Sequence, residues 1–225
     1  MDSKESVEAA FNELKLELDT LHSVKEQVKA AVDKLEATSE AIFNELQNFH
    51  QNTTADYVTE ICNHARKLFS KVKEDITGLQ KTFPLSDYYR YADHWHHIMQ
   101  NLVFQCSLII YMEEDTLVTR DQVAQLLGVS TDKADGFHIT LEDYLQGVLL
   151  LPAELTRIAV NCVIHEDYQR PIKIASFLSQ LNAAYKMLNL KNDALRRKYD
   201  GLKYEVKKAE GIVYDMKIRR LIPSS

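Results

Sequence analysis

The segment Tyr88–His97 contains the densest group of side chains that could do chemistry, with four aromatic residues, one arginine and three histidines in ten positions. Arg90, His94 and His97 are spaced i, i+4 and i+7, so a continuous helix would place them on one face. Single-stranded nucleic acids are bound by rings that stack on unpaired bases and by cations that contact phosphates. This pattern therefore predicts a nucleic-acid-binding surface.

The same segment allows two other interpretations. Tyr91, Trp95 and Ile98 share a second helical face, and such a face is more often buried in a core than used for binding. His94 and His97 have the i, i+3 spacing of a metal-binding pair, but no third or fourth ligand accompanies them, so we predict no metal site. The rings that could stack on bases or support the helix are Tyr88, Tyr91 and Trp95.

Basic residues are concentrated near the end of the chain. The sequence has a net charge of −6, yet residues 191–220 contain ten Lys and Arg against five Asp and Glu, a local charge of +5. A net-acidic protein can still present a basic stripe to a phosphate backbone, although an ordinary solvated helix face is the alternative. Outside the aromatic segment, the basic residues considered for binding are Lys25, Lys29, Arg66, Lys67, Arg196, Arg197 and Lys198.

The carboxylates do not form an evident active site. Metal-dependent phosphodiester cleavage needs several carboxylates that converge on one or two divalent ions. The contiguous acidic residues 113–115 would instead fan out around a helix end, and the chain lacks a Gly-rich phosphate loop and the GxSxG, HExxH and CxxC motifs. Glu142, Asp143 and Glu154 remain as isolated candidates.

A heptad repeat at the N-terminus predicts a long helix that must help to position these groups. Steps of four and three residues lead from Val7 to Phe49, and eleven of the thirteen positions are apolar, with no Gly or Pro between them. Lys25 occupies one of the two polar positions, where it either snorkels from a near-surface seam or faces a polar cavity. Such a repeat is typical of a helix that packs along a seam.

The rest of the chain is also predicted to be helical, giving one all-α domain of about seven helices over residues 1–225. Thr119 with Gln122 has the spacing of a capping box, and Pro152 would kink the interior of a helix. Long N-terminal and C-terminal helices would leave apolar seams exposed, which indicates association with other chains. The expected further helices are 57–81, 86–114, 119–128, 140–165, 172–188 and one that starts at Asn192 or Asp193.

The composition excludes several classes of protein. With 225 residues, 45% of them hydrophobic, but only 6 Gly and 4 Pro, the chain is not disordered, collagen-like or a linker, and the composition disfavours a turn-rich β fold. The longest nearly apolar run, residues 102–112, is too short to cross a bilayer, and the N-terminus lacks signal-peptide features. Three widely spaced cysteines are typical of reduced thiols in the cytosol or nucleus.

Several short motifs together resemble the translin family. They are Thr82-Phe83-Pro84, Tyr88-Tyr89-Arg90, Asp93-His94-Trp95, residues 115–120, Gly136-Phe137-His138, residues 142–145, Asp167-Tyr168 and the specific run 188–208. The resemblance covers nearly the whole chain. It implies an all-α protomer, a closed octamer with an interior cavity, binding of single-stranded DNA and RNA, no membrane association, and a location in both cytoplasm and nucleus.

The resemblance also implies a partner and an activity. With its paralogue, translin-associated factor X, a member of this family forms an endoribonuclease complex that removes cleaved passenger strands and so promotes activation of the RNA-induced silencing complex. Mg²⁺ is expected to serve that nuclease activity, whereas binding needs no cofactor.

Residue by residue, the resemblance carries the family's nucleic-acid-binding positions onto this chain. His96 stands where relatives commonly have arginine, and it is a weaker cation at neutral pH. A leucine-zipper-like segment falls at about residues 181–202. The matched binding segment is Arg90, Tyr91, Ala92, Asp93 and His94, and the matched basic positions elsewhere are Lys25, Lys29, Arg66, Lys67, Arg196, Arg197 and Lys198.

The positions credited with catalysis in the paralogue differ here. Asn101, Phe104 and Leu150 replace three of its carboxylates, and only Glu154 is retained. None of these replacements ligates a divalent cation as a carboxylate does, so this chain is expected to bind and shape RNA while the paralogue cleaves it. Two alternatives stay open: a homo-oligomer that cleaves RNA itself with Glu154 and a metal ion, and a coiled-coil scaffold without a nucleic-acid role.

Overall fold

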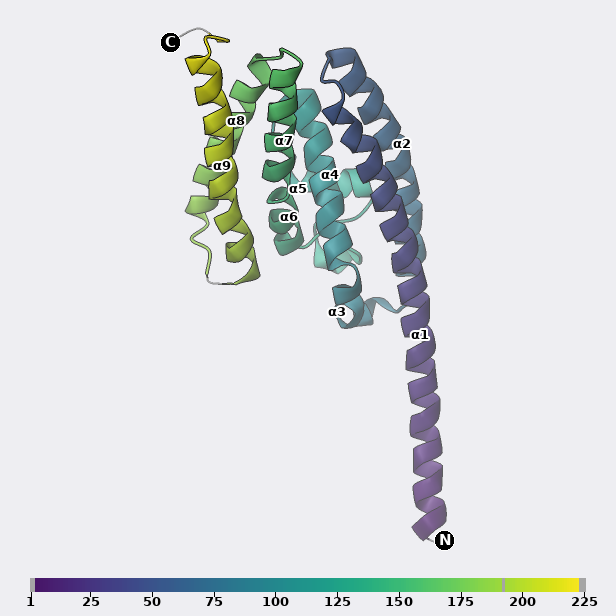
Figure 1. The fold of residues 1–225 in the computed structure, drawn as a ribbon. Helices are drawn as coiled ribbons and strands as arrows, with labels where there is room; N and C mark the ends of the chain where they lie inside the picture. The colour runs from purple at the N-terminus through teal and green to yellow at the C-terminus, as the bar shows by residue number, and fades with distance from the viewer. Residues whose placement is uncertain (1–2, 192, 223–225) are drawn as a thin grey trace.

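Nine α-helical segments dominate the computed structural model, which describes residues 3–191 and 193–222 (Figure 1). Over these residues there is no β-strand, only an isolated bridge between Ser130 and His138. The predicted all-α class is confirmed, although α3 is a single turn. The helices are α1 (Ser3–Leu46), α2 (Ala55–Gln80), α3 (Tyr88–Tyr91), α4 (His96–Glu114), α5 (Arg120–Leu127), α6 (Leu141–Val148), α7 (Leu151–Ile164), α8 (Gln169–Met187) and α9 (Ala194–Ile218).

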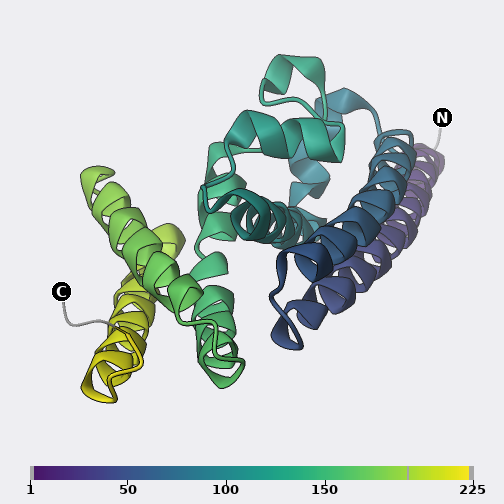
Figure 2. The ribbon, with the colours of Figure 1, turned by 90° about the horizontal axis from the view of Figure 1, so that it is seen from above.

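The C-terminal half of α1 packs antiparallel to α2 and contributes one side of the core (Figures 1 and 2). Its heptad positions Val28, Val32 and Leu35 are buried, as the repeat predicts. The α-helix ends before the repeat does, because residues Gln47–His50 form a 3₁₀ turn, which still buries Phe49.

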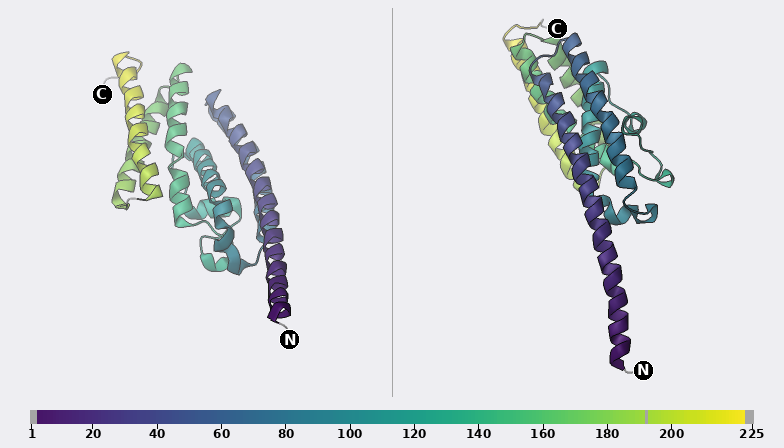
Figure 3. Two further views of the ribbon diagram at one scale, coloured as in Figure 1. Left: turned by 60° about the horizontal axis from the view of Figure 1, so that its bottom comes forward. Right: turned by 90° about the vertical axis from the view of Figure 1, so that its right-hand side faces the viewer.

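The N-terminal half of α1 projects beyond the other helices (Figures 1 and 3). Its heptad positions Val7, Phe11, Leu14 and Leu18, here called the α1 stripe, are 51–68% exposed. The heptad seam therefore extends beyond the region where other helices of the protomer cover it. This agrees with the expectation that exposed seams remain for other chains.

α4 is the central helix of the fold, in contact with α1, α2, α6 and α7 (Figure 2). The apolar run 102–112 lies within it and is buried throughout. Because neighbours surround α4, its sequence is apolar on nearly all sides instead of on one stripe.

The expected single helix over residues 86–114 is wrong. Leu85–Asp87 and Ala92–His94 are 3₁₀ turns on either side of α3, and Trp95 has φ −121° and ψ −5°, outside helical geometry. The indole of Trp95 is fully buried, so tertiary packing of this large ring overrides continuation of the helix. Its ring packs on Phe83, Tyr88 and Phe137, with centroids 5.2–5.3 Å away.

The expected helix over residues 140–165, kinked at Pro152, is also wrong. α6 ends at Val148 and α7 begins at Leu151, so Pro152 lies in the first turn of a new helix, where its missing N–H breaks no hydrogen bond. By length and composition Leu141–Ile164 could cross a membrane, but 56% of its apolar window is buried inside the protein. It is better described as two core helices.

α8 and α9 form a helical hairpin on the side of the molecule opposite α1 (Figures 1 and 3). The zipper-like segment 181–202 is divided between them, because α8 ends at Met187. Leu181, Leu195 and Leu202 are buried in the core, and Leu188, just after α8, is 47% exposed, so the leucines do not form one row. The leucine spacing therefore reflects packing of the hairpin.

Several helix ends follow their predicted caps. A capping box is present at Thr119, and α5 ends at Gly128, whose φ of 68° favours glycine. At the start of α9 the side chain of Asp193 accepts a hydrogen bond from the backbone N–H of Arg196 at 2.9 Å. Asn192, the alternative start, lies outside the described residues.

Candidate nucleic-acid interface

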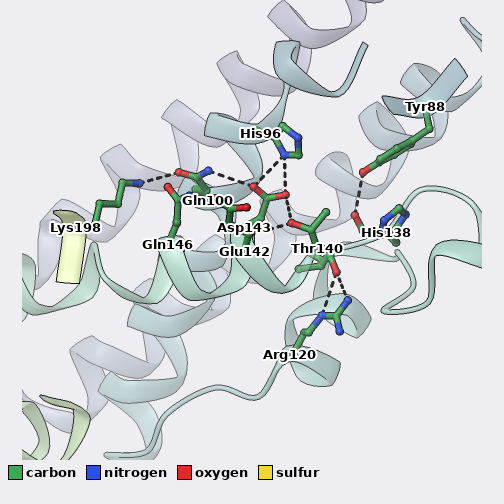
Figure 4. Close-up of polar contacts among 11 residues, drawn as sticks. Tyr88, His96, Gln100, Arg120, His138, Thr140, Glu142, Asp143, Gln146 and Lys198 are labelled. Carbon is green, nitrogen blue, oxygen red and sulfur yellow. Dashed lines mark hydrogen bonds and ion pairs between the residues drawn. The ribbon is translucent and has the colours of Figure 1, made fainter. Parts of the chain in front are cut away.

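Asp143 is the centre of a polar network that joins the start of α4 to the start of α6 (Figure 4). Its carboxylate accepts hydrogen bonds from His96 Nδ1 at 2.8 and 3.0 Å, from Thr140 Oγ1 at 2.7 Å and from Gln100 Nε2 at 3.2 Å. Thr140 is also the N-cap of α6, since its hydroxyl accepts from the backbone N–H of Asp143 at 3.0 Å. Both carboxylate oxygens are thus used inside the protein.

His96 and Asp143 shift each other's ionisation. The hydrogen bond to Asp143 raises the pKa of His96 against the opposing effect of burial. Burial alone would raise the pKa of Asp143, but hydrogen bonds from His96, Thr140 and Gln100 outweigh it and lower that pKa. The ion pair therefore makes its full contribution to the free energy of unfolding at pH values between the ordinary pKa of a carboxylate and that of an imidazole. This contribution is lost as the pH rises through the raised pKa of His96 or falls through the lowered pKa of Asp143.

Lys198 brings α9 into the same network. Its Nζ donates to Gln100 Oε1 at 2.8 Å, across 98 positions of sequence, and partial burial lowers the pKa of Lys198. Because Gln100 donates its amide N–H to Asp143, its carbonyl oxygen faces the lysine (Figure 4). Two predicted binding segments, one on α4 and one on α9, therefore meet at a single glutamine.

The structure separates the three residues that a continuous helix would have aligned. Arg90, at the end of α3, is exposed and borders a hollow of about 510 Å³ that α1 lines with Glu13 and Glu17. His94 is half-buried in the 3₁₀ turn, and His97 on α4 is exposed within 3.4 Å of Glu36. The predicted common face fails because the helix is interrupted at Trp95.

The exposed ring of the aromatic segment is Tyr89, which is not among the rings selected from the sequence. Tyr88, Tyr91 and Trp95 are buried and support the fold, so they cannot stack on bases. Tyr89 is 65% exposed and stands edge-on to Tyr88, with ring centroids 5.2 Å apart. The i, i+3, i+7 spacing of the three buried rings could have identified Tyr89 as the ring left outside.

The remaining predicted cations differ in whether an acidic side chain of the protein pairs with them. Arg66 pairs with Glu113 at 2.5 Å, and Arg196 pairs with Asp200 at 3.3 Å, so each already has an anionic partner. Asp93, the acidic member of the matched segment, is exposed. The exposed lysines and arginine of this set are Lys25, Lys29, Lys67 and Arg197. Lys25 thus lies at the surface of the α1 seam, as the snorkelling interpretation predicts.

The four positions that the family resemblance aligns with carboxylates of the paralogue do converge. Asn101, Phe104, Leu150 and Glu154 line one cavity of about 310 Å³ between α1, α4 and α7. Glu154 is buried, and its carboxylate is already engaged by three side chains of the chain itself. They are Gln47 Nε2 at 2.9 Å, His50 Nε2 at 2.6 Å and Arg157 Nη1 at 2.9 Å.

The carboxylates of this cavity do not form a site for a divalent cation. A Mg²⁺ site uses carboxylate oxygens that are free to coordinate. Of the four aligned positions only Glu154 carries a carboxylate, and its oxygens are already engaged. Glu36 and Glu40 also line the cavity, both from α1. Among the side chains that the structure describes, from residue 7 to 222 except 192, no group of three His, Cys, Asp or Glu could hold a metal ion. Glu154 instead ties the 3₁₀ turn after α1 to α7.

Replacing Glu154 with alanine is expected to lower the free energy of unfolding by about 1–3 kcal/mol, because buried polar groups lose their partner. Urea unfolding measures the change. Glu40→Ala is the matched control, since Glu40 is an exposed carboxylate that lines the same cavity, and it should change stability by less than about 0.5 kcal/mol. Equal effects of the two substitutions would contradict the anchoring role of Glu154.

Solved structures define the class of fold to which this arrangement belongs. The crystal structure of apo-NeC3PO matches with a TM-score of 0.68 at 18% identity, covering 91% of this chain and 95% of that chain. The structure of AfC3PO with duplex RNA matches with a TM-score of 0.61 at 15% identity, covering 95% of this chain and 100% of that chain. The protein therefore has the all-α fold of the C3PO structures.

The family model described as the translin family matches residues 23–220, and the chain belongs to that family. It is 44% identical over 214 residues to translin of Mus musculus and of Homo sapiens, covering 95% of this chain and 94% of each relative. It is 25% identical over 237 residues to translin-associated protein X of Rattus norvegicus, covering 96% of this chain and 80% of that relative. The family resemblance read from the short motifs is confirmed.

Proposed function

We propose that this protein binds single-stranded RNA and DNA through the surface formed by α3, the start of α4 and the start of α9. The observation that carries the proposal is the hydrogen bond between Lys198 and Gln100, in the network that also holds His96. This hydrogen bond joins the basic start of α9 to α4 one turn after His96, which supports a binding surface shared by the two helices. Tyr89 adds an exposed ring suited to stacking on unpaired bases.

The protomer is proposed to act within an assembly, as a homo-octamer and together with translin-associated factor X. The α1 stripe supports association, because exposed heptad positions gain from burial by another chain. In the heteromer this chain binds the strand, and the Mg²⁺-dependent cleavage belongs to the paralogue. Asn101, Phe104 and Leu150 carry no carboxylate, and the carboxylate of Glu154 is already engaged by side chains of this chain. The complex would promote activation of the RNA-induced silencing complex and serve RNA processing, in both cytoplasm and nucleus.

The test of binding is the double substitution Arg90→Ala with His94→Ala. Affinity for a single-stranded oligonucleotide should fall while the assembly stays intact, as measured by gel shift and light scattering. The log–log salt dependence of binding should become shallower by about 0.7 for each phosphate that the protein no longer neutralises.

Lys173→Ala is the matched control, because Lys173 is an exposed cation on α8 that pairs with Asp115, at the opposite end of α4 from His96. It should leave both affinity and salt slope unchanged. Unchanged binding by the double variant would remove Arg90 and His94 from the interface. Absence of binding to any single strand at low salt would overturn the whole proposal and favour a scaffold.

A further inference from the structure

We infer that Asp143 is a positioning residue of the interface: it holds His96 so that Nε2 contacts one phosphate of the strand, and through Gln100 it fixes Lys198, whose Nζ makes a second phosphate contact. The inference rests on the proposed function and assigns a role to Asp143 and Gln100, which lie outside the binding residues selected from the sequence. Its basis is the geometry of the network in Figure 4.

Asp143 cannot contact a ligand itself. Its side chain is 4% exposed, and its oxygens accept from His96, Thr140 and Gln100. A buried carboxylate that is satisfied in this way acts on its neighbours by charge and by fixing their orientation. The groups that it orients, His96 and Gln100, lie one helical turn apart on α4.

The atom of His96 left for a ligand is Nε2. Nδ1 lies at 2.8 Å from Asp143, while the imidazole side chain remains 32% exposed. In the neutral ring, Nδ1 keeps the proton for Asp143, and Nε2 is a bare acceptor that cannot bind a phosphate oxygen. In the cation, Nε2 carries a proton and donates a charge-assisted hydrogen bond. Asp143 favours the cation, because its hydrogen bond raises the pKa of His96.

Lys198 completes the site from α9. One N–H of its ammonium group is used by Gln100 Oε1 at 2.8 Å, which leaves two N–H donors for a phosphate. The Gln100 amide is fixed between Asp143 and Lys198, so the lysine position depends on the carboxylate. The lysine is thereby held on the far side of Gln100 from His96 before the strand arrives (Figure 4), which reduces the entropy lost on binding.

Three carboxylates act on His96, two of them on α6 and one in the 3₁₀ turn Ala92–His94. Asp143 and Glu142 on α6 and Asp93 in the 3₁₀ turn all favour its protonated form, and Lys198 on α9 contributes the second cation. Glu142 and Asp93 are exposed, so solvent and salt screen them. The negative charge of Asp143 is neutralised by the protonated His96. The positive charge of Lys198 is then not balanced by a buried carboxylate.

The experiment follows the binding of a short oligo(U) RNA by fluorescence anisotropy from about pH 5.5 to pH 8.5 at constant ionic strength. Wild-type binding should weaken as the pH rises through the raised pKa of His96. In Asp143→Asn, the midpoint of this change should fall toward the ordinary imidazole value of about 6.5. At low pH, His96→Gln should bind about tenfold more weakly than the wild type, and above the His96 titration the two should converge.

Two further measurements distinguish phosphate contact by His96 and Lys198 from a purely structural role of these residues. The imidazole resonances of His96, followed by NMR, should titrate at lower pH in Asp143→Asn and should move when RNA binds. Lys198→Ala should make the salt dependence shallower by about 0.7. Glu142→Gln is the matched control, an exposed carboxylate on the same helix, and it should leave the midpoint nearly in place. Circular dichroism checks folding; if Asp143→Asn does not fold, His96→Gln and Lys198→Ala carry the test.

The outcomes distinguish this inference from the proposed function. Wild-type pH profiles and salt slopes in His96→Gln and Lys198→Ala would overturn the phosphate site while RNA binding stands. If the double variant Arg90→Ala with His94→Ala loses RNA binding while His96→Gln and Lys198→Ala keep it, the strand contacts Arg90 and His94 and not His96 and Lys198. Movement of the His96 resonances with inorganic phosphate but not with RNA would assign the site to free phosphate and overturn its role in strand binding.

Discussion

Replacing Trp95 with alanine is expected to lower the free energy of unfolding by about 3–5 kcal/mol. The indole is fully buried between the segment before α3 and the loop before α6, where it packs on Phe83, Tyr88 and Phe137. Its removal leaves a cavity that these rings cannot collapse to fill without moving α3. Urea unfolding followed by circular dichroism measures the loss.

Tyr89→Ala is the matched control, since Tyr89 is an aromatic residue of the same segment that is 65% exposed. It should change stability by less than about 0.5 kcal/mol, while weakening single-strand binding if the ring stacks on bases. A small effect of Trp95→Ala would mean that the aromatic cluster does not hold α3 and α4 in place.

Replacing Gly147 with alanine is expected to destabilise the protein by about 1–3 kcal/mol through overpacking. A Cβ atom at Gly147 would lie 2.6 Å from the backbone oxygen of Gln100 and 2.6 Å from Val103 Cβ. α4 and α6 would therefore have to separate, although both are held by the core. Thermal unfolding measures the change, and the separation should also shift the imidazole resonances of His96, because Asp143 lies one turn before Gly147.

Gly201→Ala is the control on α9, where a new Cβ atom meets nothing within 4 Å. Alanine favours a helix interior over glycine by about 0.5–1 kcal/mol, so this substitution should stabilise the protein. The two Gly→Ala substitutions are thus expected to have opposite signs. The same sign for both would show that the α4–α6 contact can relax at little cost.

Much of the fold could be predicted because its determinants are local in sequence. The heptad repeat of α1, the capping box at Thr119 and the glycine at the end of α5 each depend on residues a few positions apart. The helix breaks at Trp95 and at Leu149 could not be predicted in this way. They depend on packing partners such as Phe137, which lies far along the chain from Trp95.

In the candidate site, too, the features that are local in sequence could be predicted and those that depend on distant residues could not. The basic residues could be selected from composition and family resemblance. Whether each one is free to contact a phosphate could not be predicted, because the acidic partners of Arg66 and His96 each lie 47 positions away in the sequence. In the sequence Asp143 is an isolated carboxylate, because its hydrogen-bond donors lie mainly on another helix. Tyr89 could have been identified as the exposed ring, because the other three rings share a helical spacing and are buried together.

The projecting half of α1 has a consequence for how the cell handles this protein. Each newly made chain presents Val7, Phe11, Leu14 and Leu18 to water, and chaperones and proteases recognise chains with exposed hydrophobic surface. Copies whose stripe stays uncovered are expected to be degraded first. The steady-state amount of the protein should then follow the supply of whatever covers the stripe, more than the rate of its own synthesis.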